Sequence, residues 1–549
     1  MTNTKNQAEI HRGRLFAGIC LALVPTGASF ALLANVLGQL KEEFILTNAH
    51  VGFIAGAAIW GMAISLLVLG PLLEGFGLKR GTVLAFIGHV CGIVLMIAAA
   101  PFAGTDAGFW MLMLGAVVLA MGNGMIEVSG NPLTAALYTE DKTTKLNWFH
   151  AFFPIGILAG SLLGYVLNVY FGGTALHHWT FQIGVILVPV IIYGIMVLPQ
   201  KFPKTEGAEA GLPVGKMFLN TLTHPLMYVM LILMAIAVSI ELGAGRWIPE
   251  VFARLDLPGI LLLSWISFIM VVLRLNAGYF VNKFSPPGLL TLGGLAMALG
   301  LLLFGTAGSG FTAFLGATFF GLGVTFFFPT VVGIVSERLP QTGSLGIVLT
   351  CGVGLAAAGG IGTPGIGGIG DLQIAQYLNQ DERRIETIEI LQGAREAFPD
   401  YAQQAHASPD PFTELGYLPE DIERALGYVN EALADYETAG EQIVGNSIPQ
   451  ALRAILGAGI SGDDLPLVEE ADALLGPAEG YAGQRALLII AWIPLILTVF
   501  FGGMYLRDRQ RGGYKAISID SLMTEGVEKA VDSTIKPAQD SSEDKGKRK

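Results

Sequence analysis

Long apolar stretches alternate with short polar ones along the chain, and twelve of the apolar stretches are long enough to cross a bilayer. A membrane-spanning helix needs about 20 predominantly apolar residues. The predicted spans lie near residues 15–40, 51–73, 81–104, 109–138, 146–172, 179–199, 224–246, 257–282, 287–309, 311–336, 344–369 and 486–506. Six spans precede the polar loop around residues 200–216, and six follow it. The pattern predicts an all-α polytopic membrane protein.

One long polar segment separates the eleventh span from the twelfth. Residues 371–484 hold 22 Asp or Glu and 5 Arg, a net charge of −17, whereas the remainder of the chain carries +5 of the total of −12. Within it, 418–426 and 447–456 each begin with a proline in the first turn of a helical pattern. We predict a small helical soluble insertion. It either selects solutes by charge at the mouth of the protein or serves only solubility.

The composition excludes several classes of protein. Charged residues make up 14% of the chain and hydrophobic residues 52%, whereas soluble proteins are about 25% charged. The acidic total argues against nucleic-acid binding, which needs clustered Lys and Arg. Cys20, Cys91 and Cys351 all lie in apolar runs, so neither a disulfide framework nor a thiolate zinc site is expected. We expect a monomer in the lipid bilayer, without a cofactor, a metal or an enzymatic activity.

The Lys and Arg residues of the short loops predict the orientation, because cytoplasmic loops are enriched in them. With the N-terminus inside, sixteen fall on the cytoplasmic side and four on the other. The sixteen are Lys5, Arg12, Arg14, Lys79, Arg80, Lys142, Lys145, Lys201, Lys204, Lys216, Lys283, Arg338, Arg507, Arg509, Arg511 and Lys515. The four are Lys41, Arg246, Arg254 and Arg485. Both termini are therefore predicted to be cytoplasmic, in the cell (inner) membrane, with the insertion outside.

These features divide the chain into six predicted segments. They are an N-terminal six-helix bundle (1–200), a cytoplasmic central loop (201–223), spans 7–11 of a C-terminal bundle (224–370), the acidic extracytoplasmic insertion (371–484), span 12 (485–506) and a disordered cytoplasmic tail (507–549). Since the tail is rich in charged residues and poor in apolar ones, we expect it to lack a packed core.

Two related polar motifs follow spans 2 and 8. Small residues let neighbouring helices approach closely, and a helix-end acid or amide followed by a cation can lock one half of a protein against the other and release it. We predict this gating role for Gly70, Glu74, Gly77, Lys79 and Arg80, and for Gly278, Asn282 and Lys283. The alternative is that these are ordinary loop charges that follow the orientation rule.

Span 11 is predicted to bend. Residues 359–368 contain six glycines and Pro364, which suits a gating helix. Close helix packing by small residues explains the glycines equally well but leaves Pro364 unexplained.

Span 4 carries a polar stripe. Asn123, Glu127 and Asn131 follow one another at intervals of four residues, so they share one face of a helix. A carboxylate at that depth is costly unless it is protonated or paired. Glu127 is therefore predicted to be a reversible proton carrier. The alternative is a permanently paired acid with Arg274 of span 8 as its partner, and in either role Arg274 points inward in preference to Asn276.

Asn123 and Asn131 are predicted to line a substrate cavity, together with three further residues. His150 of span 5 titrates in the physiological range, although a hydrogen-bonded helix-end histidine near Asn147 is an equal alternative. In span 7, Glu241 can accept bonds from hydroxyl groups and Trp247 can offer a stacking face. A Trp near the end of a span can instead be an interface anchor.

The motifs at 70–80 and 278–283, with spans divided six and six, resemble the major facilitator superfamily. Within it, the segments 122–132, 146–156, 241–249 and 328–330 resemble the fucose:proton symporter family. The resemblance covers the membrane part and not the insertion. It implies two six-helix bundles that alternate access to a central site, with the coupling proton taken by the acid at Glu127.

The chain also departs from that family. The second acid of such symporters falls at Ala34, and two polar positions that contact sugar fall on His150 and Phe153. Fucose itself is therefore not the expected solute. The predicted function is a secondary transporter that imports a small polar solute, a sugar, by proton symport. A proton-antiport exporter, a sodium-coupled carrier and a membrane sensor with an outer cap are the alternatives.

Overall fold

The computed structural model describes residues 10–44, 46, 48–253, 259–408, 417–458 and 466–517, which contain helices and no β-strand. The part of the predicted tail from residue 518 to 549 lies outside the described residues. The predicted all-α fold is confirmed.

The helices fall into two halves joined by a short linker. The N-terminal half comprises α1 (Arg12–Leu21), α2 (Leu23–Glu43), α3 (Asn48–Ile64), η1 (Ser65–Leu69), η2 (Gly70–Leu72), α4 (Leu73–Ile97), η3 (Ala100–Phe102), α5 (Asp106–Leu137), α6 (Lys142–Tyr170), α7 (Trp179–Gly184) and α8 (Leu187–Val197). The linker contains α9 (Glu206–Glu209) and α10 (Val214–Thr223).

The C-terminal half is interrupted by the polar insertion. It comprises α11 (Pro225–Ala253), α12 (Gly259–Leu275), α13 (Ala277–Phe284), α14 (Pro286–Gly305), α15 (Gly310–Val324), α16 (Phe327–Arg338), η4 (Pro340–Thr342), α17 (Gly343–Ala357), η5 (Ala358–Gly362), α18 (Thr363–Leu378) and α24 (Pro494–Gln510). The insertion contains α19 (Asp381–Ala407), α21 (Pro419–Thr438) and α22 (Ser447–Gly457), and α23 (Pro466–Ile490) leads from it to α24. We call α19, α21 and α22 the cap.

Within the described residues, ten helical stretches are long and apolar enough to cross a membrane, or eleven if the pair Leu261–Leu275 and Ala277–Phe284, bent by 69°, is one span. One of the ten, Ile59–Ile97, contains a break at Gly77, whose φ of 82° and ψ of 160° are not helical. The sequence predicts two spans on either side of this glycine. The count is thus consistent with twelve.

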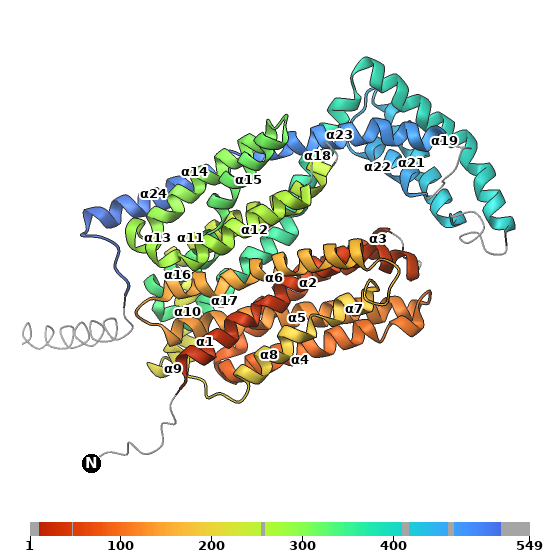
Figure 1. The fold of residues 1–549 in the computed structure, drawn as a ribbon. Helices are drawn as coiled ribbons and strands as arrows, with labels where there is room; N and C mark the ends of the chain where they lie inside the picture. The colour runs from red at the N-terminus through yellow and green to blue at the C-terminus, as the bar shows by residue number, and fades with distance from the viewer. Residues whose placement is uncertain are drawn as a thin grey trace, which may run out of the picture.

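The two halves lie side by side, and the cap stands beyond one end of them (Figure 1). At that end α18 and α23 extend from the membrane helices into the cap. The chain enters at the opposite end, where α1 begins. We call these the cap end and the terminal end.

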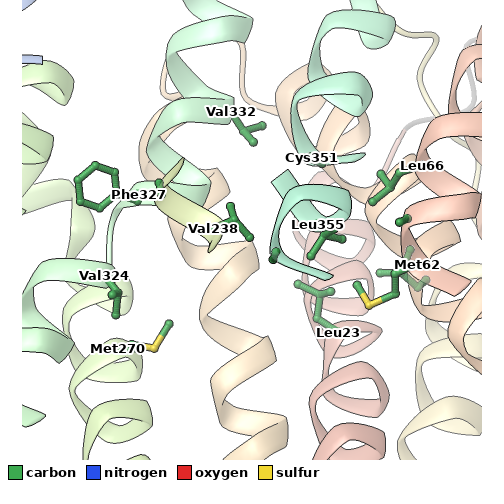
Figure 2. Packing of buried hydrophobic residues seen from close by; sticks show 14 of the residues in the cluster. Leu23, Met62, Leu66, Val238, Met270, Val324, Phe327, Val332, Cys351 and Leu355 are labelled. Carbon is green, nitrogen blue, oxygen red and sulfur yellow. The ribbon is translucent and has the colours of Figure 1, made fainter. Parts of the chain in front are cut away.

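Buried apolar side chains form one continuous cluster through both halves. Met62 and Leu66 of the N-terminal half lie beside Leu355 of the C-terminal half (Figure 2). Large apolar residues such as Trp110, Phe311 and Val499 are exposed instead, as expected for side chains that face lipid. A second buried cluster, which includes Phe398, Val429 and Leu452, joins the cap to α18 and α23.

Two local predictions can be compared with the structure. Span 11 is interrupted by the π-helical segment η5 (Ala358–Gly362), where the glycine-rich sequence predicts a bend. The predicted disordered tail, in contrast, begins too early. The helix α24 continues to Gln510, and Tyr514 donates a hydrogen bond to Glu337, so the chain is ordered beyond residue 507 because it packs on the end of α16.

Candidate functional site

A chain of buried polar groups connects α5 with α6. The amide nitrogen of Asn131 donates to the Glu127 carboxylate (2.6 Å) and to the backbone carbonyl of the same residue (3.0 Å). The Asn131 amide oxygen lies 2.8 Å from Nε2 of His150. The Nδ1 atom of His150 is 3.8 Å from the other Glu127 oxygen. All three side chains are buried, so the predicted proton carrier lies within a defined hydrogen-bonding environment.

Arg274 of α12 joins this chain to the C-terminal half. Its Nε atom donates to the carbonyl of Thr325 (2.6 Å), and one terminal nitrogen donates to the carbonyl of His150 (3.0 Å). The other terminal nitrogen lies 3.5 Å from the carboxylate of Glu241 in α11. A guanidinium can serve three directions at once because its donors form a rigid fork. Arg274 therefore bridges the two halves.

Arg274 pairs with a different acid from Glu127, the partner considered from the sequence. Its ion pair is with Glu241 of the same half, and its direct contact with α6 is a backbone carbonyl. Glu127 instead contacts Asn131 and His150. Asn276 is exposed and donates to the Val272 carbonyl, which confirms that Arg274 points inward.

Asn123 belongs to a separate polar network inside the N-terminal half. Its amide oxygen accepts from Nε2 of His89 (3.0 Å), and its nitrogen donates to the hydroxyl of Ser29 (3.1 Å). Nδ1 of His89 lies 2.9 Å from the Tyr193 hydroxyl. Residues four apart on a helix are rotated by about 40°. Two such steps carry Asn123 away from Asn131 and toward α2 and α4.

Trp247 is likewise separated from the buried chain. It lies six residues after Glu241 on α11, so the two side chains leave the helix on different faces. The indole nitrogen donates to the Thr363 carbonyl (3.0 Å). Trp247 and Pro364 line a cavity of about 450 Å³ between α11, α18, α22 and α23 at the cap end. The predicted pairing of Glu241 and Trp247 in one cavity wall is therefore wrong.

Three of the predicted gating residues lie at the contact between the halves, near the terminal end. The Glu74 carboxylate accepts from the Thr205 hydroxyl (2.6 Å) and from the backbone N–H of Ser344 (3.4 Å) at the start of α17. A side chain on Gly70 would collide with Val348 of α17, and one on Gly278 would approach Thr144 of α6. These glycines permit the close approach of helices from opposite halves.

The other members of the two motifs lie elsewhere. Gly77 adopts a left-handed conformation that only glycine reaches without strain. Lys79 donates to the Gln200 carbonyl (3.1 Å) within the loop region, and Lys283 donates to the Tyr279 hydroxyl (3.1 Å). Arg80 and Asn282 are exposed. Some residues of the two motifs thus form contacts between the halves, and others are exposed on the surface.

Sequence reasoning missed a second carboxylate at this contact. Glu337 of α16 accepts from the backbone N–H (3.0 Å) and the hydroxyl (2.7 Å) of Thr143 in α6. Nearby, Asn147 donates to the Thr330 hydroxyl (3.1 Å). The only signal in the sequence was an acid-base pair, Glu337 and Arg338, at the end of an apolar span.

Within the described residues, no group of three or more His, Cys, Asp or Glu could hold a metal ion. A family model described as Major Facilitator Superfamily matches residues 19–361. The chain belongs to the Major Facilitator Superfamily. Members of this family are membrane transporters, and the described residues contain the many long apolar helices of a multi-pass membrane protein.

Two curated proteins are similar to parts of this chain. The L-fucose-proton symporter of Escherichia coli (strain K12) is 25% identical over 150 residues, which are 27% of this chain and 33% of that protein. The cis,cis-muconate transport protein of Acinetobacter baylyi is 27% identical over 180 residues, 32% of this chain and 40% of that protein. The chain thus covers less than half the length of either curated relative.

Among solved structures of the Major Facilitator Superfamily, the transporter FucP in the outward conformation superimposes with a TM-score of 0.52 at 19% identity. The superposition covers 65% of this chain and 92% of FucP. This similarity concerns the fold. The family match ends at residue 361, before the cap begins.

Proposed function

We propose that this protein imports a small neutral polar solute, a sugar, by proton symport across the cell (inner) membrane. The buried chain from Glu127 through Asn131 and His150 to the backbone contact with Arg274 carries the proposal. It places one titratable carboxylate next to a titratable imidazole, at a contact between two halves that must separate during alternating access. The orientation follows the loop charges, with both termini cytoplasmic and the cap outside.

The proton acts at Glu127 in this mechanism. Since the amide oxygen of Asn131 can only accept, Nε2 of His150 is the donor, and the neutral ring directs its Nδ1 lone pair toward Glu127. At 3.8 Å this pair is too long for a hydrogen bond. A small movement brings a protonated Glu127 within reach of His150, so the two residues form a site that can accept and release one proton.

Arg274 couples the proton to the conformation. When Glu127 is ionised, the guanidinium attracts it across the contact between the halves, and when Glu127 is protonated that attraction is lost. Glu241 keeps Arg274 paired in both cases, so the cation stays buried without a large penalty. Protonation therefore biases the separation of the halves at the terminal end.

Apart from the contact of Arg274 with the His150 carbonyl, the polar contacts described between the halves lie near the terminal end, at Glu74, Thr143 and Asn147. We infer that this conformation is closed toward the cytoplasm. Solute would then reach Asn131, His150 and Glu241 from the cap end, and the hydroxyl groups of a sugar would find both donors and acceptors on these side chains. The name of the E. coli relative supports a sugar, although the substitution at Ala34 speaks against fucose itself.

The test is uptake by the purified full-length protein in proteoliposomes, with D-glucose, D-galactose, L-fucose and cis,cis-muconate as radiolabelled solutes and a pH-sensitive dye inside. Accumulation of a sugar driven by an inward proton gradient, together with internal acidification, is expected. Accumulation driven only by a sodium gradient would overturn proton coupling, and transport of muconate alone would overturn the sugar.

A further inference from the structure

The cavity at the cap end is formed jointly by the membrane part and the cap. Its walls include Trp247 of α11, Pro364 and Asp371 of α18, Arg453 of α22 and Glu479 of α23. Its volume of about 450 Å³ falls within the range of small-molecule sites, roughly 300–1,000 Å³. Glu127 and His150 do not line it, so it is distinct from the buried chain.

One wall of the cavity is flat and apolar. The Trp247 indole packs against Gly367, where a side chain would collide with the ring, and its hydrogen bond to the Thr363 carbonyl fixes the orientation. Around Gly368 and Gly370, which also line the cavity, there is open space where a side chain would be. A rigid aromatic face beside bare backbone suits the apolar face of a ring-shaped ligand.

Another part of the cavity wall is polar and carries both hydrogen-bond donors and acceptors. Arg453 lies 2.9 Å from a carboxylate oxygen of Asp371 and 2.9 Å from one of Glu479. Burial opposes the charge of this guanidinium, but the two carboxylates outweigh burial and raise the pKa of Arg453 above its ordinary value. Three segments that are distant in the sequence thus meet at one fixed cation.

The charges define the class of ligand. An anion would meet two carboxylates, and a cation would meet Arg453 between them. Hydroxyl groups both donate and accept, so they can bond to the carboxylates and to the guanidinium at once. We propose that this cavity is a second, outer binding site, which takes a neutral hydroxylated solute before it enters the central site. The identity of that solute as the transported sugar rests on the proposed function.

A substitution that fills the cavity can be compared with a matched control on the same helix. Gly368 and Gly365 lie on the same helix, and neither has an atom within 4 Å of where a side chain would start, but only Gly368 lines the cavity. Gly368→Leu should fill the cavity, whereas Gly365→Leu should not. Arg453→Gln is a second variant, with Arg424→Gln as its control because Arg424 forms a similar pair with Asp421 on the cap surface.

The measurement is equilibrium dialysis of the full-length protein with radiolabelled D-glucose, D-galactose and L-fucose, combined with uptake kinetics. The wild type and both controls should bind two sugars per chain, and Gly368→Leu and Arg453→Gln one. Loss of one or two hydrogen bonds should raise the KM for uptake about tenfold with an unchanged maximal rate. Glucosamine and glucuronate, the charged analogues, should compete less well than glucose.

The outcomes separate this site from the proposed function. If sugars are transported but Gly368→Leu and Arg453→Gln leave both the stoichiometry and the KM unchanged, the outer site is wrong and the function stands. If no sugar is transported, but a sugar binds and Gly368→Leu abolishes that binding, the outer site is confirmed and the proposed transport function is wrong. Absence of any sugar binding, or tighter binding of glucosamine than of glucose, overturns the assignment of the outer site.

Discussion

The carboxylate of Glu337 accepts hydrogen bonds from both the backbone N–H and the hydroxyl of Thr143 (3.0 and 2.7 Å). The first N–H groups of a helix have no partner within the helix. The side chain of Asp141, which precedes α6, accepts no hydrogen bond from them. An acid of the C-terminal half thus completes a helix of the N-terminal half. Glu74 makes the reciprocal contact with the start of α17.

Replacing Glu337 should open the terminal end. Hydrogen bonds to charged groups contribute about 1.5–3 kcal/mol each, and each 1.4 kcal/mol is about a tenfold change in an equilibrium. Glu337→Ala should therefore shift the population toward the cytoplasm-open state by about tenfold or more. Spin labels on the exposed residues Lys79 and Lys283 would report this shift as longer distances. Glu140→Ala is the control, because Glu140 pairs with Arg12 inside the N-terminal half. Unchanged distances in Glu337→Ala would contradict a gating role.

Glu127→Gln should uncouple transport from the proton. The glutamine oxygen can still accept from Asn131, so the packing of the site is kept, but no proton can be exchanged. We expect accumulation driven by a pH gradient to be lost, whereas exchange of labelled for unlabelled solute at equal pH persists. Glu140→Gln should behave as the wild type. If Glu127→Gln still accumulates solute in response to pH, another group carries the proton.

Arg274 and Glu241 should be strongly coupled in stability. Both side chains are largely buried, and removal of one partner of a buried pair costs roughly 3–5 kcal/mol because the other charge is left uncompensated. Arg274→Gln and Glu241→Gln should each destabilise the protein in thermal unfolding in detergent. The double variant should recover most of that loss. Effects that simply add would show that the two charges do not interact.

Removal of the cap tests the sensor alternative. Because α18 packs beside α23, residues 380–465 can be replaced by a short Gly-Ser linker that joins the two helices. The apolar residues of α18 and α23 that the cap covers, such as Leu378 and Leu475, are changed to polar residues in the same variant. We expect uptake to continue at saturating solute, with a higher KM because Arg453 is lost. Preserved uptake excludes a protein that only senses. Complete loss of uptake by a variant that folds normally would mean that the cap is part of the transport mechanism.

Much of the fold was predictable because bilayer spans are local features of a sequence. The apolar stretches, the break at Gly77 and the irregular segment Ala358–Gly362 follow from composition along the chain. The helices at 419–438 and 447–457 also begin where the early prolines indicate. The ordered segment around Tyr514 was not predictable, since its order depends on a contact with Glu337, which is distant in the sequence.

The sequence was sufficient to predict which residues form the candidate site, but not which of them contact one another. Glu127, Asn131, His150, Arg274 and Glu241 were all recognisable as polar residues inside apolar spans, and the structure joins them in one chain of contacts. Asn123 and Trp247 satisfied the same criterion, yet they lie in other surroundings.

The sequence by itself determined the class of protein, the uneven distribution of charge and the few buried acids, because each depends on the residue and its near neighbours. Only the tertiary structure decided that Arg274 pairs with Glu241, that Glu337 caps α6 and that the cap shares a cavity with Trp247. Such contacts depend on how each helix is rotated and where distant helices cross. A shift of about 100° per residue along a helix is enough to exchange one partner for another.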